Sequence, residues 1–258
     1  MFKVVHYHIK TNKLLGEGRS VTFALVTDLH RQWWGERQAL LMDTLEQEAP
    51  DAVLMSGDIF HHKEPFEGSR MFVREAVKRF PCYYVTGNHE NKSGIVEEFK
   101  RFLRDSGVSV LDGECEVFET HGCRVNICGA EEYRLIGVEE MHRQLRRASE
   151  AADKNLFTVL LSHRPELIDA YLPYGFDLIL CGHAHGGQWR IPGLINGFYA
   201  PGQGLFPKYA GGRYEFSDAN YGRGTTMIVG RGLVNGGYHV PRLFNPPELP
   251  IITIDYSS

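Results

Sequence analysis

The chain has 258 residues, of which 43% are hydrophobic, and a formal net charge of -4. This is enough apolar material for a substantial buried core, so a peptide hormone or a disordered tail is excluded. Positive and negative residues are interspersed, which leaves no electrostatic footprint for nucleic acid, and we expect no nucleic-acid partner. We expect a single domain over residues 1–258.

The first residues, Met1 to Lys13, interrupt their apolar positions with His6, His8 and Lys10 and therefore lack the apolar run of a signal peptide. No other segment approaches the ~20 apolar residues that a membrane-spanning helix needs. We expect a cytoplasmic protein without a transmembrane segment. Peripheral contact with a membrane and the oligomeric state are left open.

The chain contains five cysteines, an odd number: Cys82, Cys115, Cys123, Cys128 and Cys181. All but Cys115 lie in or beside apolar runs typical of buried strands. Cys123 and Cys128 do not have the C-x-x-C spacing of zinc ribbons or redox motifs. We therefore expect reduced core cysteines.

The first part of the chain alternates short apolar runs with helical patterns, the rhythm of an α/β layered fold. Strands are expected at residues 21–27, 52–56 and 82–86. Helices are expected at residues 36–48, ended by Pro50, and over 72–80 and 95–103, with Gly107 at the end of the last.

Between residues 108 and 130 the pattern changes to short strands separated by Asp112-Gly113 and His121-Gly122. Both dipeptides are turn signals for antiparallel pairing, and they indicate a second sheet. A helix is expected at 139–150, and strands at 157–162, 177–181, 226–229 and 251–254.

Polar residues that can bind metal follow five of the expected strands. They are Asp28-Leu29-His30, Gly57-Asp58, Gly87-Asn88-His89-Glu90, Ser162-His163-Arg164 and Gly182-His183-Ala184-His185. Sheets of α/β proteins place their ligand sites at such strand ends. On an extended backbone, residues two apart point the same way, so Asp28 with His30 and His183 with His185 are each expected to face one site.

Three further features favour a site for two metal ions. The carboxylate of Asp58 has two oxygens and can bridge cations held about 3.5 to 4 Å apart. Asn88 offers a neutral carbonyl oxygen. Gly57, Gly87 and Gly182 let the backbone turn close to the ions without a Cβ in the way.

Each of these signals alone has an ordinary structural explanation. Asp28-Leu29-His30 taken singly is typical of a solvated strand end, Gly57-Asp58 of a turn, and His163 beside Pro165 of a helix cap. The Gly-Asn-His-Glu and Gly-His-Ala-His runs are more specific. Asp28, Asp58 and Asn88 also follow one another at equal intervals, which favours one shared site.

The ordered series resembles the calcineurin-like metallophosphoesterase superfamily, whose pattern is D-x-H, G-D, G-N-H-[DE], a later His and G-H-x-H. Further runs resemble its YkuE/YaeI-like phosphodiesterase branch: residues 163–166, 182–188, 200–204, 206–209 and 231–233. The resemblance covers residues 21–254. It implies an α/β fold, a β-sandwich of two mixed sheets flanked by α-helices.

The resemblance also implies a set of metal ligands. The first metal would be held by Asp28, His30 and His185, the second by Asn88, His163 and His183, and Asp58 would bridge them. Imidazole nitrogen mixed with hard oxygen, without thiolate, suits two divalent ions such as manganese, our first expectation, or iron or zinc.

A water that bridges two such ions is acidified and becomes a hydroxide nucleophile, while the ions neutralise charge on the phosphoryl oxygens. His89 is expected at the edge of the site, where it protonates the leaving oxygen or stabilises the transition state. Arg164 either contacts substrate phosphate or forms a structural salt bridge. His62 either lines the cleft or lies in an exposed loop, and Lys208 is a candidate for facing the phosphate.

These features predict a phosphodiesterase or pyrophosphohydrolase that acts on a small phosphodiester or a nucleotide-linked substrate. Within the branch that the chain resembles, a nucleotide-linked lipid such as UDP-diacylglucosamine is one such substrate. The alternatives are a phosphomonoesterase, including a protein phosphatase, a nuclease, and a non-catalytic scaffold with the same fold.

Overall fold

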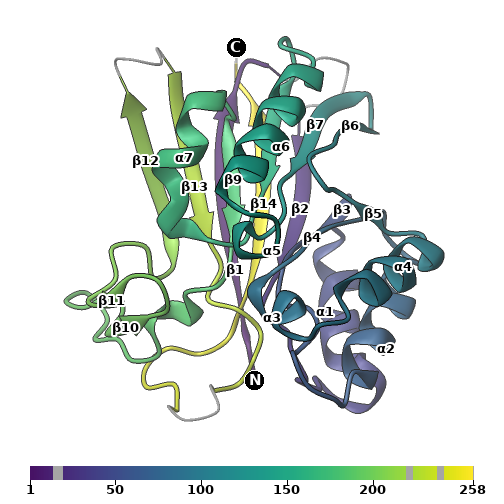
Figure 1. Cartoon of the computed structure of the whole chain (residues 1–258), viewed down its shortest axis with the longest axis vertical. Helices are drawn as coiled ribbons and strands as arrows, with labels where there is room; N and C mark the ends of the chain where they lie inside the picture. The colour runs from purple at the N-terminus through teal and green to yellow at the C-terminus, as the bar shows by residue number, and fades with distance from the viewer. Residues whose placement is uncertain (14–19, 219–222, 237–240, 258) are drawn as a thin grey trace.

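Two six-stranded mixed sheets form the centre of the protein in the computed structural model, which describes residues 1–13, 20–218, 223–236 and 241–257 (Figure 1). The first sheet has the order β1-β14-β2-β3-β4-β5. Its strands are β1 (Lys3–Thr11), β14 (Glu248–Tyr256), β2 (Ser20–Val26), β3 (Ala52–Ser56), β4 (Cys82–Val85) and β5 (Ser109–Val110). β2 to β5 run parallel, whereas β14 is antiparallel to β2.

The second sheet has the order β12-β13-β9-β8-β7-β6. Its strands are β12 (Gly212–Asp218), β13 (Arg223–Val229), β9 (Leu178–Cys181), β8 (Phe157–Leu161), β7 (Cys123–Gly129) and β6 (Cys115–Thr120). The four central strands are parallel and the two edge strands are antiparallel to their neighbours. A short pair, β10 (Tyr199–Ala200) and β11 (Gly204–Leu205), lies outside both sheets.

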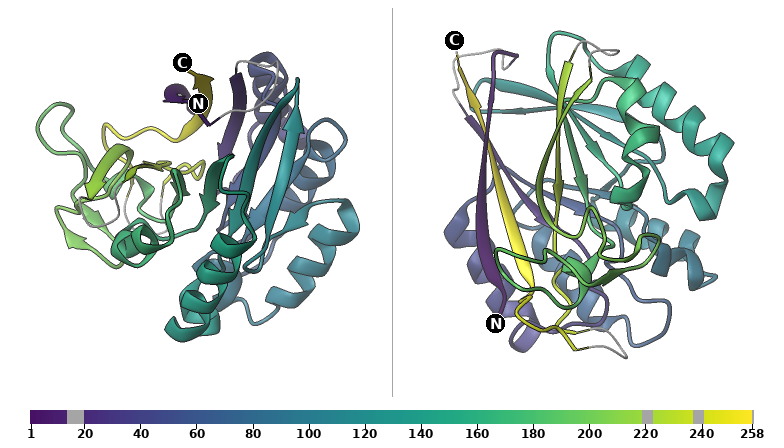
Figure 2. Two further views of the ribbon diagram at one scale, coloured as in Figure 1. Left: turned by 90° about the horizontal axis from the view of Figure 1, so that it is seen from above. Right: turned by 90° about the vertical axis from the view of Figure 1, so that its left-hand side faces the viewer.

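Helices cover the outer face of each sheet (Figures 1 and 2). Over the first sheet lie α1 (Ala39–Glu48), α2 (Glu67–Ala76), α3 (Asn88–Lys92) and α4 (Val96–Ser106), with the 3-10 turn η1 (Glu36–Gln38) before α1. Over the second lie α5 (Tyr133–Ile136), α6 (Val138–Ala151) and α7 (Ile168–Tyr171). The remaining 3-10 turns are η2 (Pro165–Leu167), η3 (Leu172–Tyr174) and η4 (His185–Gly187).

Alternation along the strands sorts their side chains into separate layers of core. In β2, Phe23 and Leu25 face the second sheet, whereas Ala24 and Val26 face the helices of the first. A third layer packs the other face of the second sheet against α6 and α7. Because strands buried on both faces read as continuous apolar runs, the sequence pattern identified them well. The expected sandwich of two mixed sheets flanked by helices is confirmed.

The antiparallel turn expected at His121-Gly122 joins β6 to β7 and is confirmed. The one expected at Asp112-Gly113 is wrong, because β5 pairs with β4 in the first sheet while β6 pairs with β7 in the second. The chain passes from one sheet to the other at this point. A turn dipeptide reports local backbone shape and does not specify which strands pair.

Several elements have no counterpart among the expected ones. β1 lies in the N-terminal segment, for which the sequence analysis predicts no strand. Its buried Ile9 lies between the exposed His8 and Lys10, which is the alternation of a half-buried strand. The five-residue helix α3 begins inside the Gly-Asn-His-Glu run, too short for a periodic apolar pattern.

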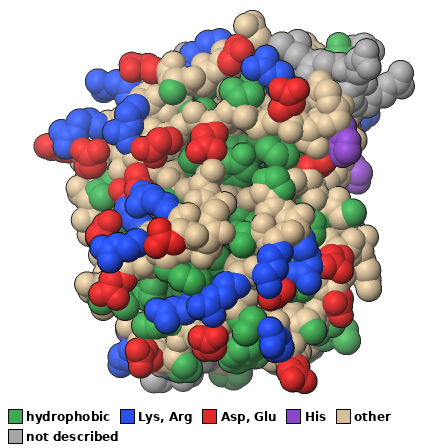
Figure 3. All heavy atoms as spheres, turned by 90° about the vertical axis from the view of Figure 1, so that its right-hand side faces the viewer, with side chains coloured by type: hydrophobic (Ala, Val, Ile, Leu, Met, Phe, Trp, Pro, Cys, Tyr) green, Lys and Arg blue, Asp and Glu red, His purple; other side chains and the backbone are tan. Residues whose placement is uncertain are grey.

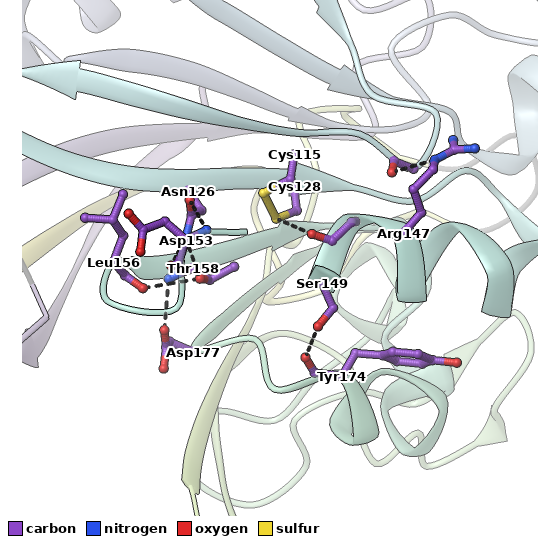
Figure 4. Close-up of a disulfide and its surroundings, with 12 residues drawn as sticks. Cys115, Asn126, Cys128, Arg147, Ser149, Asp153, Leu156, Thr158, Tyr174 and Asp177 are labelled. Carbon is purple, nitrogen blue, oxygen red and sulfur yellow. Dashed lines mark hydrogen bonds between the residues drawn. A yellow bond between two sulfur atoms is a disulfide. The ribbon is translucent and has the colours of Figure 1, made fainter. Parts of the chain in front are cut away.

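The expectation of reduced cysteines is wrong at one pair, since Cys115 and Cys128 form a disulfide (Figure 4). The register of the β6–β7 hairpin places these two residues opposite each other, which brings their side chains to the same face. The Sγ of Cys128 also lies 3.8 Å from the carbonyl oxygen of Ala148 on α6. Cys82, Cys123 and Cys181 are free and buried.

None of the helices in the described ranges is both long and apolar enough to cross a lipid bilayer. On the face shown in Figure 3, basic and acidic side chains are interspersed over the helices of the first sheet. That face therefore carries no basic stripe of the kind that binds nucleic acid.

Candidate metal centre

The candidate site lies where the carboxyl ends of the central strands of both sheets meet. Asp28 and His30 follow β2, Asp58 follows β3, and Asn88 follows β4. From the second sheet, His163 follows β8, and His183 and His185 follow β9. Backbone hydrogen bonds tie neighbouring ends together, from Asp28 N to Gly57 O (3.2 Å) and from Gly182 N to His163 O (3.1 Å).

The side chains at these ends form two groups that share one residue. One consists of Asp28, His30, Asp58 and His185, and the other of Asp58, His163 and His183, and within each group the ligand atoms lie within 4.8 Å of one another. Asn88 lines the same cavity, of about 90 Å³, as Asp58, His183 and His185. The seven predicted ligands are thus brought together, with Asp58 in the middle.

Several atoms in these groups are buried and lack a hydrogen bond within the described part of the chain. They are His30 Nδ1, Asp58 Oδ2, Asn88 Oδ1, His163 Nε2 and His185 Nδ1. A buried polar atom without a partner costs about 1 to 3 kcal/mol. Asp58 Oδ2 and His163 Nε2 lie 3.3 Å apart as an ion pair, and a cation among the five atoms would supply the missing interactions, so the residues present fit a metal centre.

The backbone at the site is unusual, because five of the seven residues have a left-handed conformation. The φ angles are 52° at Asp28, 54° at His30, 53° at Asp58, 67° at His183 and 48° at His185. The expectation of an extended backbone at the two D-x-H and H-x-H pairs is therefore wrong. Such strain is uncommon for residues with a Cβ and clusters at functional sites.

Glycines allow the strand ends to approach one another closely. A Cβ on Gly182 would lie 1.9 Å from the Oγ1 of Thr27 and 2.5 Å from the Oδ2 of Asp28. A Cβ on Gly87 would lie 2.3 Å from the Oδ1 of Asp58. A Cβ on Gly57 would lie 2.6 Å from the Nδ1 of His163, so the prediction that glycine is needed beside the ligands is confirmed at all three positions.

Burial and neighbouring charges shift the pKa values of the site in opposite directions. Burial alone would raise the pKa of Asp58, but His163 and His30 hold it well below its usual range. Burial alone would lower the pKa of His163, but the charge of Asp58, 3.3 Å from its Nε2, raises it to about 10. Burial raises the pKa of Asp28, although His185 opposes this.

Hydrogen bonds also fix the ring of His163. Its Nδ1 lies 2.8 Å from the carbonyl oxygen of Ser56 and donates to it, which leaves Nε2 facing Asp58. Metal-binding histidines commonly donate their other ring N–H to a carbonyl in this way. The remaining imidazoles have pKa values lowered mainly by burial and are neutral at pH 7: His30, His183 and His185.

His89 lines the cavity at its edge, as expected. Its backbone N–H donates to the Oδ1 of Asp58 (2.7 Å), and its Nδ1 lies 2.9 Å from the Nδ1 of His62. Burial lowers the pKa of His89 to about 4. His62 therefore reaches the edge of the site through His89, on the same side as the buried His61.

The other two candidates for substrate binding lie in different surroundings. Arg164 lines the cavity but is buried. It donates to Glu132 and, at 3.0 Å, to Glu166, so it forms the structural salt bridge that was one of its two expected roles. Its Nη1 also lies 2.8 Å from the Nε2 of His183. Lys208 is exposed and lies over the ring of Tyr209, and it is not among the residues that line the cavity.

The sequence analysis missed several residues at the site. Lys92 and Arg134 line the cavity and give its mouth two cations. Lys92 could have been found from its position four residues after Asn88. No sequence signal points to Arg134. Glu90 ends the Gly-Asn-His-Glu run, is fully buried and accepts three backbone N–H bonds, a role that its motif does not indicate.

Two mixed sheets with a cluster of Asp, Asn and His side chains at their carboxyl ends are the features that the comparison with known proteins also identifies. A profile of the family described as calcineurin-like phosphoesterase matches residues 21–187. The chain belongs to this family. The description of the family names phosphoesterases, and the two ligand groups of this chain could hold metal ions.

Individual relatives are more distant. The chain is 26% identical to Escherichia coli phosphodiesterase YaeI over 159 residues, 60% of this chain and 56% of that one. It is 26% identical to Bacillus subtilis YkuE, an uncharacterized metallophosphoesterase, over 217 residues, 82% of this chain and 70% of that one. The chain spans about half the length of the first curated relatives that it matches.

Among solved structures, a dimetal phosphatase from Danio rerio resembles the chain with a TM-score of 0.52 and 13% identity, covering 93% of this chain and all of that one. This likeness supports the fold.

Proposed function

We propose that the chain is a phosphodiesterase or pyrophosphohydrolase that uses two divalent metal ions. The observation that carries the proposal is the pair of ligand groups joined at Asp58, with five buried atoms that lack a hydrogen bond. Family membership supports hydrolysis of a phosphoester, and the name of the relative YaeI favours a diester.

Asp28, His30 and His185 would hold one ion and Asn88, His163 and His183 the other, with Asp58 between them. Nitrogen and oxygen donors without thiolate suit manganese, followed by iron or zinc. When bound, two such ions acidify a water molecule for attack and neutralise charge on the phosphoryl oxygens. The strained backbone holds the donors in place before any ion arrives.

His89 is the catalytic residue of the proposal. Its backbone N–H bond to Asp58 fixes it beside the metal ligands, and its ring lines the cavity. With a pKa of about 4, the ring is neutral at pH 7 and offers one N–H. A bound phosphate raises the pKa of a neighbouring imidazole, which favours proton donation to the leaving oxygen.

Lys92 and Arg134 are proposed to bind the anionic part of the substrate, because they are the cations at the rim of the cavity. Arg164 is proposed to position His183, because its Nη1 contacts that ring while its Nε and Nη1 donate to Glu132 and Glu166. Lys208 does not line the cavity and is not part of this proposal.

The test is hydrolysis of bis(p-nitrophenyl) phosphate and p-nitrophenyl phosphate by metal-stripped protein to which manganese is added back. We expect metal-dependent cleavage with the diester preferred. Asp58→Asn should lower turnover by about 100-fold or more, since even groups behind a metal ligand contribute 10- to 100-fold. Asp105→Asn, an exposed carboxylate on α4, is the matched control.

Preference for the monoester would assign the chain to the phosphomonoesterases instead. Turnover that Asp58→Asn leaves untouched would contradict a two-metal mechanism. If neither ester is cleaved with manganese, iron or zinc, the scaffold alternative gains support.

A substrate that carries an apolar chain is also proposed, because exposed apolar side chains gather next to the cavity. This apolar lobe consists of Trp189, Ile191, Leu194, Phe198, Tyr199, Leu205, Phe206, Leu243 and Phe244. The ring of Phe198 contacts Trp189 (centroids 5.7 Å apart) and Phe206 (5.5 Å), so the surface is continuous there. The strands β10 and β11 carry part of it and project from the sheets (Figure 2).

Two features favour a lipid-linked substrate over a soluble one. Pro201, between β10 and β11, lines the cavity that holds Asp58, so the lobe and the metal site adjoin. Residues 178–214 contain no Asp or Glu, whereas Arg190 and Lys208 lie among the apolar residues. Apolar side chains with basic neighbours suit the surface of an anionic membrane.

The protein should therefore sediment together with vesicles of phosphatidylglycerol. Replacing Leu194 and Phe206 by Ser should weaken this binding by about 10-fold or more, because fully burying one such apolar side chain contributes about 1.5 to 3 kcal/mol. Val117→Ser, an exposed apolar residue on β6, is the control. Equal sedimentation of all variants would argue against the lobe as the contact surface.

A further inference from the structure

Three histidine rings form a cluster beside the metal ligands but outside both ligand groups. His61 and His62 follow β3, and His89 lies on α3. One nitrogen from each ring can be chosen so that the three atoms lie within 4.8 Å of one another. The Nδ1 atoms of His62 and His89 are 2.9 Å apart, and the ring centroids of His61 and His62 are 4.0 Å apart.

We propose that His61, His62 and His89 form a third metal site, selective for zinc or a similar transition metal ion. Zinc binds imidazole nitrogen at about 2.0–2.1 Å, so a tetrahedral ion needs its nitrogens about 3.3 Å apart. The Nδ1 atoms of His62 and His89 lie 2.9 Å apart, somewhat closer than this value, and the three ligand nitrogens all lie within 4.8 Å of one another. Small rotations of the rings would therefore complete the geometry.

The cluster has the chemistry of a zinc site and not of a magnesium or calcium site. It offers three nitrogen donors and no carboxylate, whereas magnesium and calcium prefer oxygen. Three histidines also leave a fourth tetrahedral position for water. The half-buried rings of His62 and His89 place the cluster at an accessible edge, while His61 lies behind them.

The third site should fill after the two-metal centre. Its ligands are neutral imidazoles that compensate none of the charge of the ion. The ring of His89 also lies 4.5 Å from that of His30, so an ion here is repelled by cations in the centre. The negative charge of Asp58 lies in the two-metal centre and attracts cations there. The two-metal centre should therefore bind its ions before the histidine cluster does.

Occupation should inhibit the enzyme, a consequence that rests on the proposed function. The ring of His89 lines the cavity together with Asp58 and Asn88. A metal ion bound to one nitrogen of this ring would hold the ring in the cluster and keep that nitrogen from the substrate. Zinc above the amount that fills the centre is therefore expected to slow hydrolysis.

The binding test measures zinc uptake by the metal-free full chain, with equilibrium dialysis and elemental analysis of the protein. We expect three zinc ions per wild-type chain and two in His62→Asn. His62→Cys should regain the third ion, because a thiolate is also a zinc ligand of similar reach. His121→Asn, an exposed histidine in the β6–β7 turn, should bind three.

Two ions in saturated wild-type protein, or three in His62→Asn, would overturn the site. Because uptake is measured without turnover, the result separates this proposal from the proposed function. A single ion that is lost in His62→Asn would support the third site and contradict the two-metal centre.

The turnover test adds zinc to the manganese-loaded protein. The zinc concentration for half inhibition should rise at least about 10-fold in His62→Asn, each variant being compared with its own activity without zinc. Uptake of a third ion with no loss of turnover would overturn the inhibitory role of His89.

Discussion

Asp58 is the residue on which both halves of the site depend. Its Oδ1 accepts the backbone N–H of His89, and its Oδ2 lies 3.3 Å from the Nε2 of His163 and 3.9 Å from that of His30. In the metal-free protein, the negative charge of Asp58 favours the protonated form of His163. The positive imidazolium then pairs with the carboxylate. The strength of this pair should be visible in the stability of the metal-free protein.

We predict that the metal-free protein loses stability between pH 6.5 and pH 10. The pKa of His163 is raised from 6.5 to about 10 in the folded state, so its contribution is full below pH 6.5 and disappears as the pH approaches 10. The pKa of Asp58 is lowered below 3.8, so its contribution is present above that pH and is lost only in acid.

Guanidinium unfolding at several pH values, with a chelator present, measures this effect. The free energy of unfolding should fall by a few kcal/mol, roughly the order that a pKa shift of this size implies. In Asp58→Asn the decline over the same range should be much smaller, because the partner charge is gone. Parallel curves for the two proteins would contradict the pairing.

At the scale of elements, Glu90 connects the loops that follow β3 and β4. Its Oε2 accepts N–H bonds from Asp58 (2.9 Å) and Gly87 (3.0 Å), and its Oε1 accepts one from Phe60 (2.8 Å). The first helical turn of α3 is thereby tied to the end of β3. This network positions Asp58 and Asn88 without contacting an ion.

Glu90→Gln should weaken metal binding, because the amide nitrogen cannot accept a bond and would face a backbone N–H. We expect manganese affinity to fall 10- to 100-fold, the usual cost of losing a group behind the ligands, and stability to fall by about 1 to 3 kcal/mol. Isothermal titration with manganese measures the first effect. Glu98→Gln, an exposed residue on α4, should change neither.

The central strands and the residues that follow them could be predicted from the sequence, because parallel buried strands are continuous apolar runs and their carboxyl ends share one edge. β3 was predicted with its observed bounds. The left-handed backbone at Asp28 and His183 could not be predicted, because it depends on contacts between distant loops. The same holds for Arg134, which reaches the cavity from α5.

Long-range pairing accounts for the larger errors. β1 forms the edge of the first sheet only because β14, from the other end of the chain, lies beside it (Figure 1). The Cys115–Cys128 disulfide follows from the register of the β6–β7 hairpin, which the position of the turn at His121-Gly122 determines. Reading that register outward from the turn would have placed the two cysteines opposite each other.

At the scale of the whole molecule, the metal centre brings together polar side chains from both sheets. The first sheet supplies Asp28, His30, Asp58 and Asn88, and the second supplies His163, His183 and His185. An apolar layer that includes Phe23 and Leu25 also packs between the sheets. Ions that bind here would link both sheets in the folded state and have no preformed site in the unfolded chain.

Metal should therefore stabilise the whole fold against unfolding. At a free manganese concentration of 100 times Kd, binding at one site adds about 2.7 kcal/mol, and the melting temperature should rise with metal concentration. A chelator should reverse the rise. In Asp58→Asn, which removes the ligand shared by the two groups, manganese should shift the melting temperature much less, as calorimetry with and without metal can measure. A melting temperature that manganese leaves unchanged in the wild-type protein would show that the centre does not couple the sheets.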